Sequence, residues 1–140
     1  ALGAQLRYHT QLAPQLSELA ILVTARHCSS PFEWDAHRPE AQRAGLAESI
    51  IDSLLAQMVP EAMSAEQSAV YHFARELNRH DSVSDKTYAV ALALFDARTL
   101  VELTALVGYY TLVAMTLNTH EIPLAEGTRP AFALPQHDKF

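Results

Sequence analysis

Three side chains near the start of the chain could together transfer protons: Glu18, Glu33 and His37. Glu33 and His37 are four residues apart, so on a helix they would project from one face. Glu18 lies upstream in an apolar stretch, where it is either solvated or drawn into the interior. If the two segments pack antiparallel, one imidazole and two carboxylates converge. Burial and like charge would then raise a glutamate pKa toward neutrality, as general acid–base catalysis requires.

Each of these residues also has a purely structural interpretation. The segment from Ser30 to Glu33 has the pattern of a helix start: Ser30 is the N-cap, Pro31 is the first helical residue, and Glu33 completes a capping box. Glu33 could serve only that purpose, His37 could be an ordinary hydrogen-bonded helix residue, and Glu18 could face solvent. Spacing alone leaves both interpretations open.

Helices are the elements that would position these residues. Apolar residues at spacings of three and four predict a helix that has Pro14 in its first turn and ends at about His27. The helix that starts at Ser30 should kink or break at Pro39, because proline cannot continue a regular hydrogen-bond ladder, and Gly45 should cap its end. The periodic residues of the first helix are Leu12, Leu16, Leu19, Leu22 and Val23.

The remaining pattern is also helical. We expect helices over about 47–58, from Ser64 onward and over about 85–95, with Ser64 and Ser84 as N-caps. The apolar stretch 99–117 is too apolar all round for a surface helix and should be a core or subunit-interface helix. Proline and glycine after residue 120 predict an extended arm. The chain is therefore predicted to be an all-α bundle of about six helices, with one domain at 1–120 and a C-terminal arm at 121–140.

Composition narrows the class of protein. The chain has 140 residues, enough for one core, and a net charge of −6, which argues against nucleic acid or an anionic membrane as partner. No stretch of eighteen uninterrupted apolar residues and no leader pattern is visible, so we expect no membrane span and a cytoplasmic location. Cys28, the single cysteine, cannot form an internal disulfide. No metal-ligand spacing is recognisable, so neither a metal nor another cofactor is expected.

Several ordered blocks resemble the carboxymuconolactone decarboxylase and AhpD-like family. The first is ELAILVTAR at 18–26, and the second is FEW at 32–34, followed by His37, Ala41 and Gly45-Leu46. Later blocks at 83–85, 101–103, 108–110, 113–118 and 123–124 follow the family pattern, so the resemblance covers about 12–127. It implies an AhpD-like helical fold and a homo-oligomer, commonly a trimer or hexamer. Family members generally carry residues before the first block, so we expect a leading helix to be missing or disordered here.

The peroxidases of this family have a glutamate, then a CxxC pair at a helix start, then a histidine one turn later. Counted along this chain, that glutamate falls on Glu18, the histidine on His37, and the two cysteines on Ser30 and Glu33. Because Ser30 and Glu33 cannot form a disulfide, the chain should not be a CxxC peroxidase and resembles the decarboxylase-type branch. The helix start that would stabilise a thiolate there is expected here to favour an ionised Glu33.

The resemblance implies a cofactor-independent lyase of aromatic-acid breakdown that acts on a small carboxylated lactone or a related acidic ring compound. We assign His37 as general acid, Glu33 as its electrostatic or hydrogen-bond partner, and Glu18 as proton relay or orienter. The residues expected to bind substrate are Ser30, Arg26 and Trp34. Tyr109 and Tyr110 could reach the site, but we expect them to pack at an interface.

Other functions stay open. A related lyase, hydrolase or isomerase on a small acidic ring compound would use the same residues. A non-enzymatic oligomer that binds a small ligand would need only the pocket. A single-cysteine antioxidant, similar to a peroxidase, would depend on Cys28, which we expect to be an ordinary buried or half-buried thiol.

Overall fold

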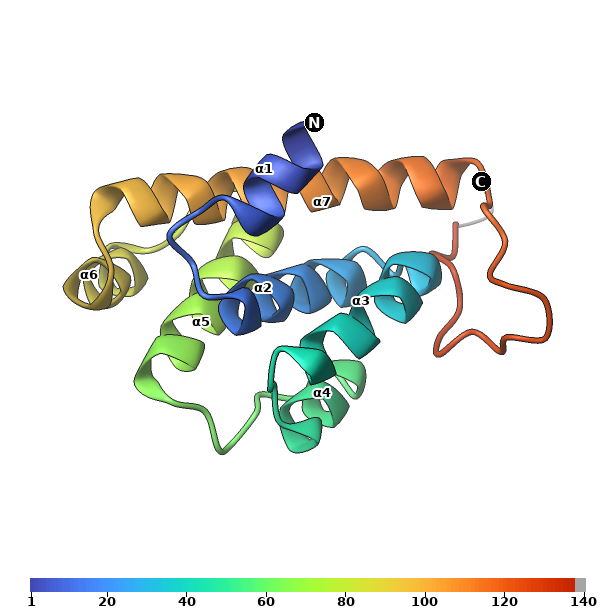
Figure 1. Cartoon of the computed structure of the whole chain (residues 1–140), viewed down its shortest axis with the longest axis horizontal. Coiled ribbons are helices and arrows are strands. Elements are labelled where there is room, and N and C mark those ends of the chain that lie inside the picture. The colour runs from blue at the N-terminus through green and yellow to red at the C-terminus, as the bar shows by residue number, and fades with distance from the viewer. Residues whose placement is uncertain (138–140) are drawn as a thin grey trace.

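A computed structural model describes residues 1–137, which form seven α-helices and no strand (Figure 1). The all-α class is therefore confirmed, with one helix more than the six expected. The extra helix, α1, precedes the first predicted one, so residues 2–8 are helical where we expected a leading helix to be missing or disordered. The helices are α1 (Leu2–Tyr8), α2 (Pro14–His27), α3 (Pro31–Arg43), α4 (Glu48–Leu55), α5 (Ala65–His80), α6 (Asp85–Leu94) and α7 (Ala97–Thr119).

The central element is α2. Every residue from Leu16 to Ala25 is buried, because α1, α3, α4, α5 and α7 all pack against this helix. A helix that is covered on all sides must be apolar on all sides, which explains the leucine, isoleucine, valine and alanine of this segment. Glu18 lies within this buried run, so it is drawn into the interior rather than solvated.

Most helix boundaries follow their sequence signals. Pro14 occupies the first turn of α2, and Ser84 caps α6 through its side chain. The capping box at α5 is complete, since the Gln67 backbone N–H donates to Ser64 Oγ at 3.1 Å and the Ser64 N–H donates to Gln67 Oε1 at 2.8 Å. Gly45 follows α3 with φ of +88°, the left-handed conformation in which glycine commonly ends a helix.

The expected break beside His37 is absent. The helix α3 runs continuously from Pro31 to Arg43, with Pro39 inside it. Proline removes the hydrogen bond to the carbonyl four residues earlier, which belongs to Asp35. Both Asp35 and Pro39 lie on the exposed side of α3, where water can satisfy that carbonyl, so the helix continues.

The longest helix, α7, is buried on one face only. Residues on its buried face pack against α2 and α5, while Val101, Leu112 and Met115 are exposed. Among the residues described, α7 is the one helix long and apolar enough to cross a membrane, and a core helix of a soluble protein passes the same test. Single threonines interrupt its apolar stretch, so the sequence contains no unbroken apolar run long enough to span a membrane. The buried face consists of Thr99, Leu100, Leu103, Leu106, Val107, Tyr110 and Ala114.

The segment after α7 forms a loop at one end of the molecule, without a helix or strand over residues 121–137 (Figure 1). Phe132 anchors it: the ring packs edge-on against Trp34 with centroids 5.8 Å apart, and the Arg26 guanidinium lies 4.4 Å from its centroid. These contacts are in the range of aromatic and cation–π pairs. The final part of the predicted arm, 138–140, lies outside the described residues.

Candidate active site

Glu18 and His37 meet between α2 and α3. The two helices pack against each other, and His37 Nδ1 lies 2.8 Å from Glu18 Oε2. The side chains are 11% and 5% exposed, so water screens this contact weakly. With Nδ1 engaged by the carboxylate, the other ring nitrogen, Nε2, is the one available to exchange a proton with a ligand.

A third charged residue, Arg7, completes this network from α1. Arg7 Nε donates to Glu18 Oε1 at 2.8 Å, and its terminal nitrogen lies 3.5 Å from Glu40 Oε2. Where α1 approaches α7, Gly3 packs against Tyr109, and a Cβ at residue 3 would lie only 2.5 Å from the Tyr109 hydroxyl oxygen, so the tyrosine side chain would have to shift. The guanidinium and the imidazole thus each take one oxygen of Glu18. We call Arg7, Glu18 and His37 the Glu18 network.

Tyr110 also reaches this network. Its ring packs edge-on against the His37 imidazole, with centroids 5.0 Å apart and planes at 86°. Burial raises the pKa of the Tyr110 hydroxyl to about 12, so the phenol stays protonated at neutral pH. Of the two roles considered for Tyr110, the structure shows the contact with the site, which it makes with His37 from α7; packing at a subunit interface stays a prediction.

Glu33 is buried but does not join the network. Its exposed fraction is 2%, and among residues 1–137 neither of its carboxyl oxygens has a hydrogen-bond partner. Burial raises its pKa to about 8, so the carboxyl is largely protonated at neutral pH. The expectation of an ionised Glu33 is therefore wrong: removal from water outweighs the favourable position at a helix start. The partner of His37 in this structure is Glu18, not Glu33.

The expected capping box at Ser30 is also absent. Ser30 has ψ of 94°, whereas Ser64 and Ser84, which do cap their helices, have ψ of 166° and 156°. The Ser30 hydroxyl consequently does not reach the first-turn N–H groups. Three buried polar side chains, Ser30, Glu33 and Trp34, have atoms with no hydrogen-bond partner in the described part of the chain. We call them the α3 cluster; a group of unpaired polar atoms is uncommon in a protein interior.

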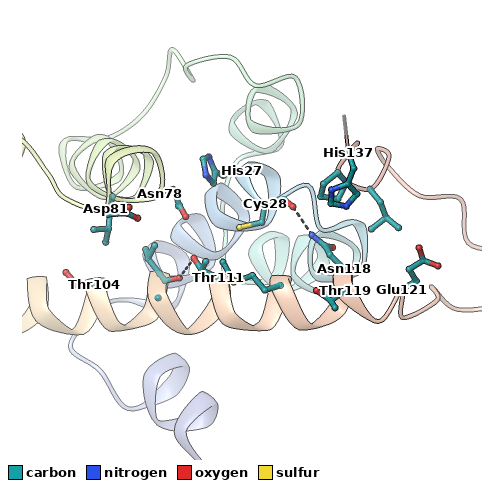
Figure 2. A pocket seen from close by; sticks show the side chains of 16 residues that line it. His27, Cys28, Asn78, Asp81, Thr104, Thr111, Asn118, Thr119, Glu121 and His137 are labelled. Carbon is teal, nitrogen blue, oxygen red and sulfur yellow. Dashed lines mark hydrogen bonds between the residues drawn. The ribbon is translucent and has the colours of Figure 1, made fainter. Parts of the chain in front are cut away.

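A large open cavity lies between α5 and α7 at the end of α2 (Figure 2). Its volume is about 680 Å³, and Cys28, Thr111 and Asn118 are among its lining residues. Asn118 Nδ2 donates to the Cys28 carbonyl at 2.9 Å, as Figure 2 shows. Burial, with the nearby Glu33 as a second cause, raises the pKa of the Cys28 thiol to about 11. Glu18, Glu33 and His37 are not among the residues that line this cavity.

Two residues expected to bind substrate make structural contacts. Arg26 Nε donates to the Leu55 carbonyl at 2.9 Å, and its guanidinium covers the Phe132 ring. Trp34 is 1% exposed and packs against the same ring. The structure therefore does not bring Arg26 to the Glu18 network, and it places Trp34 in the core beside Glu33. A role for either residue in binding substrate stays a prediction.

The sequence alone did not show that Arg7 belongs to the site, and it gave no reason to prefer Tyr110 over its neighbours. Arg7 lies in a helix of seven residues, which is too short to show an apolar period, so nothing in the sequence indicated its role. Tyr110 lies in a uniformly apolar stretch in which no spacing distinguishes the residue that touches His37. Within residues 1–137, no group of three histidine, cysteine, aspartate or glutamate side chains could hold a metal ion.

Comparisons of the chain with models of protein families, with curated proteins and with solved structures found no match. The chemistry of the site therefore has to be inferred from its own residues.

Proposed function

We propose that the chain is a cofactor-independent carboxy-lyase of the carboxymuconolactone decarboxylase type, with an AhpD-like fold and a cytoplasmic location. Its substrate would be a small carboxylated lactone or a related acidic ring compound. The observation that supports this most directly is the buried Glu18–His37 pair, held at 2.8 Å with Arg7 on the other carboxylate oxygen. An imidazole with one nitrogen fixed by a carboxylate is a general acid whose orientation is set before substrate binds.

The reaction requires the protein to move one proton. The bond between the ring carbon and the departing carboxylate breaks, and its electron pair delocalises into the unsaturated carbonyl of the lactone. Carbon dioxide leaves, and the protonated His37 donates its Nε2 proton to the resulting dienolate at carbon. Solvent then returns a proton to the imidazole. Glu18 stabilises the imidazolium before the transfer, and Arg7 holds Glu18 in place.

The α3 cluster would supply the second half of the site. A protonated Glu33 is neutral, so it can donate a hydrogen bond to a substrate carboxylate or carbonyl oxygen instead of repelling it. The Ser30 hydroxyl has no hydrogen-bond partner within residues 1–137 and could donate to a substrate oxygen in the same way. The cavity at the end of α2, which Cys28 lines, has a volume of about 680 Å³, within the range of roughly 300–1,000 Å³ common for small-molecule sites.

The test is an ultraviolet assay with γ-carboxymuconolactone, in which released carbon dioxide is measured in parallel. We expect turnover by the full chain and a loss of about 10²-fold or more in kcat for His37→Gln. The matched control is His120→Gln, an exposed histidine at the end of α7, which should keep full activity. Turnover that survives His37→Gln would remove His37 from the mechanism, and no turnover with lactone acids would reject the proposed substrate class.

A second candidate is a protein that binds a small acidic ligand without converting it. The observation that favours it is that the residues lining the large cavity do not include His37. Calorimetric titration with the same lactone distinguishes the two functions, since binding without release of carbon dioxide identifies a binding protein.

The single-cysteine antioxidant is disfavoured by the chemistry of Cys28. A pKa of about 11 leaves almost no thiolate at neutral pH, and the thiolate is the form that attacks peroxide.

A further inference from the structure

The exposed face of α7 carries an apolar stripe that nothing in the described chain covers. Val101, Leu112 and Met115 are 68%, 59% and 61% exposed, and Ala105 and Gly108 lie between them on the same face. These positions are separated by three or four residues, the spacing by which helices pair side by side. We call them the α7 stripe. A helix in water normally turns polar residues outward, so a stripe of this kind indicates a covered surface.

Gly108 lies at the centre of the stripe. A glycine inside a helix costs about 1 kcal/mol relative to alanine, and such a cost usually has a packing reason. No such reason exists within the described chain, because a Cβ at residue 108 would have no atom within 4 Å. A second helix that approaches closely at this point would provide the reason, since glycine permits the backbones to come near each other.

We propose that α7 pairs with α7 of a second copy of this chain, antiparallel and around a two-fold axis that passes beside Gly108. Val101 lies seven residues before Gly108 and Met115 seven residues after it, so these three positions map onto one another when the stripe is reversed, and Ala105 and Leu112 come opposite Thr111 and Thr104. Val101 then packs against Met115 of the partner subunit, and the two glycines face each other. This is the self-complementary arrangement that a two-fold interface requires.

Charge selects this orientation and this kind of partner. Residues 103–119 contain no Asp, Glu, Lys or Arg, so the stripe offers nothing to a charged partner. Arg98, whose side chain is 70% exposed and donates to Glu102 Oε1 at 3.1 Å, flanks one end of the stripe, and Glu121 flanks the other. Antiparallel pairing brings Arg98 close to the C-terminal end of the other α7, where the helix dipole favours a positive charge. It also brings Arg98 toward Glu121 of the partner subunit, which has the opposite charge. Parallel pairing would place like charges together.

The pairing would also complete the cavity described above. Thr104, Gly108, Thr111 and Met115 belong to α7 and line the cavity beside Cys28, and Figure 2 shows α7 running along it. A second α7 laid on the stripe would narrow the open side of that cavity. A two-fold pair gives dimers, and it also occurs in a hexamer built from dimers, whereas a simple three-fold trimer contains no such contact.

The first test measures the mass in solution by light scattering after gel filtration. We expect the full chain to have an even multiple of its 15.5 kDa monomer mass and Met115→Glu to halve that multiple or reduce it further. The matched control is Met58→Glu, since Met58 is exposed to a similar degree, 63%, and lies outside the stripe. A monomeric wild-type chain, or an unchanged mass for Met115→Glu, would overturn the proposal. So would a monomer that co-sediments with phosphatidylcholine vesicles, which would assign the stripe to lipid.

The second test locates the axis and does not depend on losing the assembly. In a Cys28→Ser background, Gly108→Cys places two thiols on either side of the axis, within the roughly 3.5–4.5 Å between Cβ atoms that a disulfide needs. Mild oxidation should convert most of the chain to a covalent dimer. Thr116→Cys, exposed on α7 but off the stripe, should stay monomeric on a denaturing gel. Equal cross-linking by both variants, or none by Gly108→Cys, would refute the pairing. Neither test uses an enzyme assay, so their outcome is independent of the proposed lyase activity.

Discussion

Glu18 and Glu33 lie on neighbouring helices and are buried to similar extents, 4% and 2% exposed, but their surroundings are opposite. Arg7 and His37 each engage one oxygen of Glu18. In the described chain Glu33 has no such partner, and burial raises its pKa to about 8. The comparison shows that burial alone does not decide the charge of a glutamate; the partners that neighbouring helices supply decide it. A salt-bridged glutamate and a buried glutamate without a partner in the described chain therefore lie on neighbouring helices.

The largest effect should come from breaking the Glu18 network. We expect Glu18→Ala to lower the free energy of unfolding by about 3–5 kcal/mol at pH 7, because it removes the buried carboxylate that Arg7 and His37 share and leaves Arg7 only its longer contact with Glu40. Urea denaturation followed by circular dichroism measures the change. Glu61→Ala, at an exposed glutamate between α4 and α5, should change stability by less than about 0.5 kcal/mol. If both variants lost the same free energy of unfolding, the Glu18 network would not stabilise the fold more than an exposed glutamate does.

Replacing Glu33 should raise the free energy of unfolding at pH 7, whereas replacing Glu18 lowers it. Its pKa rises on folding from an ordinary 4.5 to about 8, so the unfolded chain releases this proton at lower pH than the folded chain does. The wild type therefore loses stability as pH rises through this window, and Glu33→Gln does not titrate and avoids that loss. The variant should be more stable than wild type at pH 7, by on the order of 3 kcal/mol, with little difference at pH 4.

Denaturation at several pH values measures this difference. Glu61→Gln is the control and should follow the wild-type pH dependence. If Glu33→Gln followed it as well, the Glu33 carboxyl would not be the buried neutral acid described above.

The smallest expected change in stability distinguishes a helix start with a serine side-chain cap, at Ser64, from one without, at Ser30. Ser64→Ala should cost about 1 kcal/mol, because it removes a working N-cap. Ser30→Ala should change stability by less than about 0.5 kcal/mol, since its hydroxyl makes no cap hydrogen bond within the described residues. Thermal unfolding of both variants at one pH compares them. A larger loss at Ser30 than at Ser64 would show that the Ser30 hydroxyl is satisfied in solution.

The sequence predicted α2 to α7 because each has a periodic apolar face, a recognisable cap or both. It missed α1, since a helix of two turns with no buried residue carries no such pattern. Glu18 and His37 were found through spacing and resemblance, whereas Arg7 came from a segment brought to them only by tertiary packing. The sequence left the protonation state of Glu33 open, because burial favours a neutral carboxyl and a helix start favours an ionised one, and the pattern does not show how deeply the side chain is buried.

The same limit applies to α7. A stretch that is apolar on every side predicts a helix away from water, but it does not say which side the chain itself covers. Only the packing of α2 and α5 against one face shows that Val101, Leu112 and Met115 lie on the other.

The contact between Phe132 and Trp34 gives this protein a built-in optical reporter. Trp34 is the only tryptophan in the chain, so its fluorescence arises from a single place, the first turn of α3. The indole is 1% exposed and lies under the segment that follows α7. If that segment lifts away, water reaches the indole and the emission should move to longer wavelength. Without any added label, the emission spectrum can therefore follow the covering of α3, one residue away from Glu33.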